Sequence, residues 1–596
     1  MQESLCHYDM SNGSIDECYA FIQSTIIASA KTLGLFKIIN SGPRYRNNKP
    51  WFDANCITLK TNTRTALKDC KSNGFNDQSV SAYVQCKKLY KSTIKTAKLK
   101  YWTEIKNEIS SCNSPSKFWQ AIKKFSKTRF IDNSSSLDMV VASDYFTQIF
   151  NCFPGVSPCP LVDLPLHNSS LDSNITMIEL QNALQRLKTN KAPGLDRIPG
   201  EFFKYLNTAN QQFLLDYFNR LLQLEQTPSE WSKLEMFLIY KKGDKKAPSN
   251  FRGISLLNTI TKLFTSILAT RITLWAEENS VISENQNGFR QGRGCNDSLF
   301  VLSCLINEQL ARKGSKLYAY FVDFKQAFDR VPHDLLWNKL GKLGISTKIL
   351  NILKSFYQNA FSKIKIGGKF TNDIPIKNGV LQGDTLSPLL FALYLADFET
   401  FFRSHNTMGF ELHNDSSLNA IFYADDLVVV ATSRARFRKQ LRTLHTYCLE
   451  NRLEVNTTKS KALIFRRSGR TCKNDVFNFN DSPIEIVSEI EYLGVIFSNS
   501  GKYERAARSA VSKASFTSHR IRSLLQKSGV DSARARVTLF DSAVKSTLLY
   551  GVEVWGLQQE ALIEGCQTNF LKSLYFLPRS TPGYILRKEF CVTKKF

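Results

Sequence analysis

The sequence has 596 residues, of which 43% are hydrophobic and 22% are charged, so the chain can bury several cores and is not of a disordered type. It carries 79 Lys and Arg against 52 Asp and Glu, which gives a formal net charge of +27 at pH 7. A globular protein this basic usually meets a polyanion, and nucleic acid is the leading expectation. A membrane partner is not expected, because no stretch reaches the roughly 18 uninterrupted apolar residues of a spanning helix.

The cysteines and the N-terminal residues indicate an intracellular protein. The 14 cysteines show no C-x-x-C pair and no zinc-knuckle spacing, which is typical of reduced core thiols. The first twenty residues lack the basic-then-apolar form of a secretory signal.

Two helical patterns stand out in the first 170 residues: Cys18–Leu35, and a long basic one from about Val80 to Ser126. The second alternates Lys with Tyr, Trp and Phe, which suits a nucleic-acid backbone with some base stacking. A solvated amphipathic helix with inward aromatic side chains explains the pattern equally well. Asp132–Ser136 and Phe153–Ser173 are expected to be linkers.

From Thr176 the pattern becomes compact α/β. Thr176 and Glu179 form a capping-box signature at the start of a helix. Further on, an apolar strand leads into a turn with Lys241 and Lys242, and Arg252 precedes the next strand. These cations would hold a triphosphate if an acidic metal site lay nearby, and otherwise they are plain surface charges.

The middle of the chain supplies a core helix, two loops and a strand. Asn258–Glu278 has the apolar period of a core-facing helix. Arg290 and Arg293 lie in a Gly/Arg-rich loop and could reach phosphates. The run Leu317–Val322 predicts a buried strand that ends at Asp323, an unlikely place for a carboxylate without a function. A later glycine-rich loop, Gly379–Asp384, allows close backbone approach to a flat ligand, and Ser387 is predicted to cap a helix that has Pro388 as its first residue.

Two adjacent acids, Asp425 and Asp426, lie between the predicted strands Ala420–Tyr423 and Leu427–Ala431. Carboxylates this close repel one another unless a cation or a proton stands between them, and Mg²⁺ suits such oxygen ligands. An ordinary surface turn is the alternative. If Asp323 lies beside this hairpin, the carboxylates converge into a two-metal site for phosphoryl transfer. Phe328, five residues after Asp323, could then close the space that a ribose 2′-OH needs.

The last part predicts a helix over Ser433–Asn451, a small hairpin turning at Gly494, and two amphipathic helices between Lys502 and Gly556. The first of these helices is strongly basic, which suits either a duplex-backbone cradle or a solvated helix face. The chain ends without a cap or breaker, and we expect it to be cut short.

Eight segments in this order resemble the reverse transcriptase of non-LTR (LINE-type) retrotransposons, closest to the jockey-like elements of arthropods. They are KAPGLDRIPGEFFK, LIYKKGD with NFRGISLLNTITKLF, NGFRQGRGCND, FVDFKQAFDRVPH, GVLQGDTLSPLLF, FYADD, NTTKSKALIF and YLGVIFS. The resemblance runs from about Lys191 to Gly501. It implies an α+β right-hand polymerase with fingers, palm and thumb and an N-terminal helical extension.

The resemblance also implies domains and site residues. Residues 1–170 would be a basic helical linker region following an absent endonuclease, 171–500 the fingers and palm (core 222–497), and 501–596 a truncated thumb. Its implied site residues are the metal-binding acids Asp323, Asp425 and Asp426, the proton donor Lys459, the nucleotide-binding Lys241, Lys242, Arg252, Phe328, Gln382 and Gly383, and the primer-gripping Tyr492, Leu493 and Gly494. Gly253 and Gln326 replace the Pro and Ser usual there, and both look tolerable.

The function implied is RNA-directed DNA polymerisation from a DNA 3′-OH with two Mg²⁺ ions, or Mn²⁺ in their place. The partners would be an RNA template, a DNA primer or target and dNTPs, with no membrane and an unspecified oligomeric state. The site of action would be the nucleus, with a cytoplasmic RNA–protein particle as a second location. Two alternatives stay open: an RNA-dependent RNA polymerase, against which Phe328 argues, and a decayed or co-opted protein that only binds nucleic acid.

Overall fold

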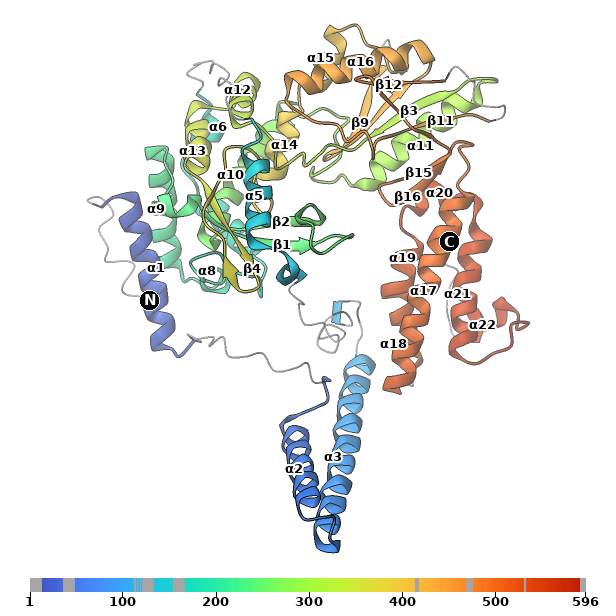
Figure 1. The fold of residues 1–596 in the computed structure, drawn as a ribbon. Helices are drawn as coiled ribbons and strands as arrows, with labels where there is room; N and C mark the ends of the chain where they lie inside the picture. The colour runs from blue at the N-terminus through green and yellow to red at the C-terminus, as the bar shows by residue number, and fades with distance from the viewer. Residues whose placement is uncertain are drawn as a thin grey trace. The chain divides into compact units, whose positions relative to one another are not determined.

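The computed structural model describes residues 13–35, 49–111, 114, 116–117, 119, 133–153, 167–412, 417–467, 475–529 and 532–589. The described residues form two compact units. The first takes its residues from Met1–Ile38, Asp132–Leu493 and Ser498–Gly501, and the second from Ile39–Ile131, Gly494–Phe497 and Lys502–Phe596. Figure 1 shows the helices and strands of both units, and each unit is described by itself below.

A five-stranded sheet in the order β14-β11-β3-β10-β9 carries the acids of the first unit. Its central strand β3 (Leu317–Val322) is antiparallel to β10 (Asp426–Ala431) and to β11 (Lys461–Phe465), while β9 (Ala420–Tyr423) and β14 (Ile486–Val487) form the edges. All six residues of β3 are buried, so the apolar run predicts the strand because both of its faces need cover.

Helices cover both faces of this sheet. α16 (Arg434–Glu450) packs on β10 and on α15 (Phe398–Ser404), while α11 (Cys295–Ala311) packs on β9 and β3, on the opposite side in Figure 1. The ring of Tyr318 in β3 lies 5.7 Å from the ring of Phe437 in α16. Alternate side chains of β3 therefore belong to two different packing layers.

A second sheet in the first unit has the order β2-β1-β4-β5, with β6 also paired to β4. Its strands are β1 (Lys233–Tyr240), β2 (Phe251–Leu256), β4 (Phe361–Ile366), β5 (Lys369–Phe370) and β6 (Ile374–Pro375). The helices of this unit include α1 (Ile15–Thr32), α5 (Met139–Phe150), α6 (Ser169–Asp172), α7 (Met177–Arg186), α8 (Glu201–Lys204), α9 (Thr208–Leu224), α10 (Thr259–Glu278), α12 (His333–Leu343), α13 (Thr347–Tyr357) and α14 (Ser387–Tyr394). The buried faces of these elements join one large apolar core.

The second unit is almost entirely helical. Its long helices are α2 (Ala54–Ser72), α3 (Asp77–Ser110), α17 (Glu504–Ser528) and α21 (Glu560–Leu574), and its shorter ones include α18 (Ala533–Leu539), α19 (Ser546–Leu548), α20 (Val552–Trp555) and α22 (Gly583–Glu589). A π-helical turn over Phe540–Lys545 joins α18 to α19. Over the described residues of both units, no helix is long and apolar enough to cross a membrane.

The α+β class and most predicted elements are confirmed, with local differences. The first helix is shifted to Ile15–Thr32, because Ser14 caps it with Glu17 as the partner of a capping box. The basic helix α3 begins at Asp77 and ends at Ser110, and residues 120–126 of the predicted pattern lie outside the described residues. The domain boundaries predicted at residues 170 and 500 stay a prediction.

Three predictions about loops were wrong. Ser387 is not a cap: it is the first residue of α14, and its hydroxyl donates to the carbonyl of Leu381 at 2.7 Å. The predicted linker at 132–136 contains a 3-10 helix over Asn133–Ser136. The predicted linker at 153–173 contains α6, in which Asn168 caps the helix, while residues 154–166 lie outside the described residues.

Candidate active site

The β9–β10 turn consists of Ala424 and Asp425. Ala424 has a φ of +60°, and Asp425 is not among the residues with positive φ, which is the sign pattern of a type II′ hairpin turn. Asp426 is not at the tip as predicted: it is the first residue of β10, opposite Tyr423. The two adjacent acids thus have different backbone settings, one in the turn and one in the strand.

Gln286 holds this turn in place. Its buried side-chain amide accepts a hydrogen bond from the Ala424 N–H at 3.0 Å and donates one to the Ala424 carbonyl at 3.3 Å. A Cβ atom on nearby Gly288 would lie 2.2 Å from the Ala424 nitrogen, so only glycine allows this close approach. These contacts offset the cost of a left-handed alanine. No local sequence pattern predicts these contacts, because Gln286 and Ala424 lie 138 residues apart.

Asp323 directly follows β3 and is fixed by the loop before β11. Its N–H donates to the Ser460 hydroxyl at 3.0 Å, and the Asn456 side-chain amide donates to its Oδ2 at 3.1 Å. The ammonium of Lys459 lies 3.7 Å from the same oxygen. Because Val322 pairs with Leu427, Asp323 and Asp426 follow at the same end of the strand pair. The structure therefore brings Lys459, Asp323 and the hairpin acids together.

The acids at this end repel one another. Burial raises the pKa of Asp425, and the negative charge of Asp323 adds to the rise while Arg252 and Lys241 oppose it. The apolar surroundings, followed by the charges of Asp425 and Asp323, raise the pKa of Asp426 to about 6, although part of that residue is exposed. Burial is thus the larger cause of both rises in pKa, the neighbouring carboxylates add to it, and a bound cation would act against both effects.

This donor set fits a divalent cation that also binds a substrate. Mg²⁺ is usually held by one or two carboxylates and completes its shell with water and phosphate oxygens. In the part of the chain that the structure describes, no three His, Cys, Asp or Glu side chains are gathered as a ready-made metal cage. The three aspartates supply only hard oxygen ligands, and a cation would relieve their repulsion.

Lys241 and Arg252, two of the predicted phosphate-binding cations, lie within electrostatic reach of the aspartates. Desolvation and the charge of Arg252 lower the pKa of Lys241, while Asp329 and Asp323 act in the opposite direction, so these four charges lie within mutual influence. Lys241 ends the β1 side of the turn, where its N–H donates to the Asn250 carbonyl at 2.8 Å. Lys242 is exposed on the same turn, and among the described residues no contact joins its side chain to the acids.

Phe328 has a fixed ring position. It stacks on Phe391 with ring centroids 4.6 Å apart and meets Phe289 edge to face at 6.3 Å. The Val380 N–H donates to the Phe328 carbonyl at 2.7 Å, which ties it to the glycine-rich loop. A ring packed in this way cannot easily turn aside.

Hydrogen bonds hold both the backbone and the side chain of Gln382. The Ser255 N–H donates to its carbonyl at 2.7 Å, and its side-chain amide donates to Asp329 Oδ1 at 2.7 Å. Gly383 has a φ of +128°, and a Cβ there would lie 2.4 Å from the Ser255 carbonyl oxygen. Desolvation raises the pKa of Asp329 to about 6. Asp329 was not predicted as a site residue, although it directly follows Phe328, because its partner Gln382 lies 53 residues away.

The predicted primer-gripping residues form the β15–β16 hairpin (Glu489–Tyr492 and Val495–Ser498). Tyr492 is buried with its ring 5.5 Å from that of Phe321, and burial, with Asp426 next, raises its pKa. Leu493 and Gly494 make the turn with φ values of +45° and +81°. Tyr492 and Leu493 belong to the first unit and Gly494 to the second.

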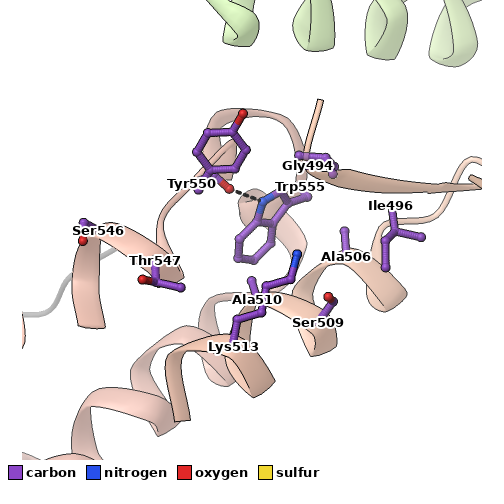
Figure 2. A pocket seen from close by; sticks show the side chains of 11 residues that line it. Gly494, Ile496, Ala506, Ser509, Ala510, Lys513, Ser546, Thr547, Tyr550 and Trp555 are labelled. Atoms are coloured by element: carbon purple, nitrogen blue, oxygen red, sulfur yellow. Dashed lines mark hydrogen bonds between the residues drawn. The ribbon is translucent and has the colours of Figure 1, made fainter. Parts of the chain in front are cut away.

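Gly494 lies at the rim of a pocket of about 270 Å³ within the second unit. Figure 2 shows Tyr550 and Trp555 across from it, with Lys513 and Ser509 of α17 below. The Trp555 indole donates to the Tyr550 carbonyl at 3.0 Å. A Cβ on Gly494 would lie 2.9 Å from the Tyr550 ring, so the turn packs closely on this aromatic residue.

The prediction that Arg290 and Arg293 reach phosphates was wrong. The Arg290 guanidinium is buried and donates to both carboxylate oxygens of Glu277, at 2.8 and 2.5 Å. Arg293 forms an ion pair with Glu284 and donates to its carbonyl at 2.9 Å. Their donors are already engaged within the fold, so the loop is braced internally.

The part of the chain that carries these residues is similar to a known protein family. Residues 239–497 match the family model described as "Reverse transcriptase (RNA-dependent DNA polymerase)". Residues 239–497 form a reverse transcriptase domain. The domain contains the three acids, Phe328 and the glycine-rich loop, and it ends within the β15–β16 hairpin.

Curated relatives of this reverse transcriptase domain come from mobile elements. The chain is 24% identical over 438 residues to the probable RNA-directed DNA polymerase from transposon BS of Drosophila melanogaster, covering 72% of this chain and 48% of that protein. It is 25% identical over 414 residues to the RNA-directed DNA polymerase from mobile element jockey of the same species, covering 66% and 43%. The chain thus spans about half the length of the curated relatives it matches.

Among solved structures, telomerase from Candida albicans in complex with a telomeric RNA fragment aligns with a TM-score of 0.35 and 13% identity, covering 96% of this chain and 98% of that one. That likeness is too low to support an argument. The polymerase fold of the reverse transcriptase domain rests on the family match and on the sheet that carries its acids.

Proposed function

We propose that this protein is an RNA-directed DNA polymerase of the non-LTR retrotransposon type, which extends a DNA 3′-OH along an RNA template with dNTPs. The observation that carries the proposal is the group of three aspartates at one end of β3 and β10, faced by Lys241 and Arg252, within a reverse transcriptase domain. Acids and cations at one site suit a metal-bound triphosphate.

Asp323 and Asp425 would hold two Mg²⁺ ions, with Asp426 as the third acid and Mn²⁺ as a substitute metal. When bound, the ions would stabilise negative charge on the attacking and leaving oxygens. The protein's own work is positioning. Lys241 and Arg252 would hold the triphosphate, and Lys459, beside Asp323, would give a proton to the departing pyrophosphate.

Phe328 and the loop around Gln382 would define the nucleotide. The stacked Phe328 ring would exclude a 2′-OH, which favours dNTPs over NTPs. Gln382 and Gly383 would lie against the nascent base pair, since the glycine allows a flat ligand to approach the backbone. The Tyr492–Gly494 hairpin would grip the primer end, and the basic helix α17 would contact the duplex backbone.

Primer extension on an annealed RNA template and DNA primer tests this function. The purified chain is expected to incorporate dNTPs in the presence of Mg²⁺ and to incorporate NTPs far less well, while Phe328→Ala is expected to raise NTP use by about tenfold or more. A protein that binds the template–primer in a salt-dependent manner but extends nothing would be a decayed or co-opted nucleic-acid-binding protein. Preferential NTP use by the wild-type protein would indicate an RNA polymerase.

A further inference from the structure

The helix α5 (Met139–Phe150) lies outside residues 239–497 but belongs to the first unit, where it packs beside the loops of the candidate active site. Figure 1 shows it next to β1 and β2, and its contacts include β6 and the 3-10 turn Pro248–Asn250 that precedes β2. Its buried side chains are those of Ala142, Phe146, Ile149 and Phe150. This apolar face anchors the helix in the core, so the side chains beside it are held in fixed places.

Hydrogen bonds tie both ends of this segment to loops of the candidate active site. Before α5, the Ser136 hydroxyl donates to the Lys245 carbonyl at 3.0 Å, on the turn between β1 and β2. At the end of α5, the Phe150 carbonyl accepts from the Lys377 N–H at 3.1 Å, two residues before the glycine-rich loop. The segment therefore connects the turn that carries the predicted triphosphate-binding cations to the glycine-rich loop.

Tyr145, in the middle of α5, reaches the loop between Asp323 and Phe328. The side-chain amide of Gln326 donates to the Tyr145 hydroxyl at 2.8 Å, across a separation of 181 residues in the sequence. Burial raises the pKa of Tyr145 and the charge of Asp329 adds to the rise. The hydroxyl therefore stays protonated at neutral pH, and it lies within electrostatic reach of that acid.

Gln326 sets the course of the turn that presents Phe328. Its φ is +50°, and its carbonyl accepts a hydrogen bond from the Asp329 N–H at 3.0 Å, which closes a turn around Phe328. A left-handed backbone at a residue other than glycine persists only where surrounding contacts hold it. The hydrogen bond to Tyr145 is such a contact, because it fixes the Gln326 side chain.

Both residues that are proposed to define the nucleotide depend on this turn. Phe328 is part of it, and Asp329, next in the sequence, accepts a hydrogen bond from the Gln382 side chain at 2.7 Å. The rings of Phe146 and Phe150 line the same small cavity as Asp329 and Gln382. A shift of the turn would therefore move the Phe328 ring and the glutamine together.

We infer that Tyr145 is a positioning residue for nucleotide selection: its hydroxyl fixes Gln326, and Gln326 sets the turn that holds the Phe328 ring where a ribose 2′-OH would lie. The inference rests on the proposed polymerase function and adds to it a residue from outside the reverse transcriptase domain. In this role Tyr145 touches neither the nucleotide nor a metal ion. The preference for dNTPs is thus set in part by a helix of the N-terminal extension.

Two readouts on the full chain test this role. The first is the Kd of the next dNTP or NTP on an RNA template with a dideoxy-terminated DNA primer, where no bond can form. The second is kcat/KM for the same nucleotides on an extendable primer. Tyr145→Phe removes one oxygen and keeps the ring, and Gln326→Met removes the donor and keeps the chain length. The control is Tyr217→Phe, which removes a hydroxyl of a buried tyrosine in the same unit that donates to the Ile15 carbonyl at 3.4 Å.

The wild-type protein is expected to prefer dNTPs in both readouts. Tyr145→Phe and Gln326→Met should each lower this preference about fivefold, since that is the effect of one neutral hydrogen bond. The double variant should also lose about fivefold, instead of the about 25-fold expected of two independent changes. In a Phe328→Ala background, Tyr145→Phe should change nothing further, because the ring that it positions is gone. Tyr217→Phe should keep the full preference, even where its urea midpoint falls as far as that of Tyr145→Phe.

An unchanged preference in Tyr145→Phe would overturn the inference. So would an equal fall in Tyr217→Phe, independent effects in the double variant, or a further fall in the Phe328→Ala background.

The inference and the proposed function fail separately. A wild-type protein that prefers dNTPs in binding, loses the preference with Tyr145→Phe and extends no primer would uphold the role of Tyr145 and refute the polymerase. Extension with a preference that Tyr145→Phe leaves intact would do the reverse. A wild-type protein that shows no preference in either readout would overturn the role of Tyr145 together with that of Phe328.

Discussion

Two groups of carboxylates in the first unit have opposite electrostatics. Glu277 and Glu284 face Arg290 and Arg293, whose hydrogen bonds and charges lower the pKa of both glutamates. Burial raises the pKa values of Asp425 and Asp426, and the negative charge of Asp323 adds to both rises. The first group is neutralised within the fold and braces a loop, while the second is left to repel, which costs stability until a cation binds.

The largest test of this contrast is Asp425→Asn. We expect primer extension to fall by about 10³-fold or more, because removing a preorganised charge from the reacting centre is the most costly change available. The affinity for the template–primer should stay within about twofold. Quenched-flow extension and anisotropy measure the two quantities. Robust extension by this variant would remove Asp425 from the metal-binding set.

The matched change in the other group is Glu277→Ala. It leaves the buried Arg290 guanidinium without its two-oxygen partner, and we expect a loss of about 2 kcal/mol in the free energy of unfolding, discounted for the partial exposure of Glu277. Urea unfolding gives the value, and extension per folded molecule should not change. A loss of catalysis at full stability would show that this loop takes part in the reaction.

Arg252 and Lys242 allow a comparison between a cation that acts on the aspartates and one that does not. Arg252→Gln should raise the KM for dNTP about tenfold, since its charge acts on Asp425 and Lys241, whereas Lys242→Gln on the same turn should change it by less than twofold. Steady-state kinetics with each variant decides. Equal effects would mean that the turn acts only through its total charge.

The smallest expected effect concerns Asp329. The folded-state pKa of Asp329 is about 6, above the ordinary value of 3.8, so the folded protein binds the carboxyl proton more tightly than the unfolded chain does. The stability that this bound proton contributes is present below about pH 4 and is lost as the pH rises to about 6. Asp329→Asn keeps an acceptor for Gln382 and removes the charge. It should therefore gain about 1 kcal/mol at pH 7.5 and nothing near pH 4, by urea unfolding at both values. An equal gain in stability at pH 4 and at pH 7.5 would show that titration of Asp329 is not the cause of the gain.

Local pattern was sufficient to predict the elements that carry the acids. The run Leu317–Val322 is a strand with the predicted ends, because a short continuous apolar run suits a strand that is buried on both faces. The hairpin of β9 and β10 was found from the β-branched and aromatic residues of its two strands.

Partners that are set by tertiary folding could not be predicted from the sequence. Arg290 looked like a phosphate ligand although its partner Glu277 is only 13 residues away, because the pairing depends on how the loop folds back on the end of α10. Asp329 carried no signal until Gln382, 53 residues away, was seen to donate to it. The Gln286 contact with Ala424 spans 138 residues and has no local signature.

That last contact has a consequence for how the site is made. A ribosome adds about 5–20 residues per second, so Gln286 emerges well before the turn that it will hold, by roughly 7–28 s for the 138-residue separation. The late-emerging acids of the turn can therefore fold onto a surface that already exists. A circular permutant that begins between β3 and β9, and so makes Gln286 after Ala424, would reverse this order of synthesis without altering a single contact of the finished site.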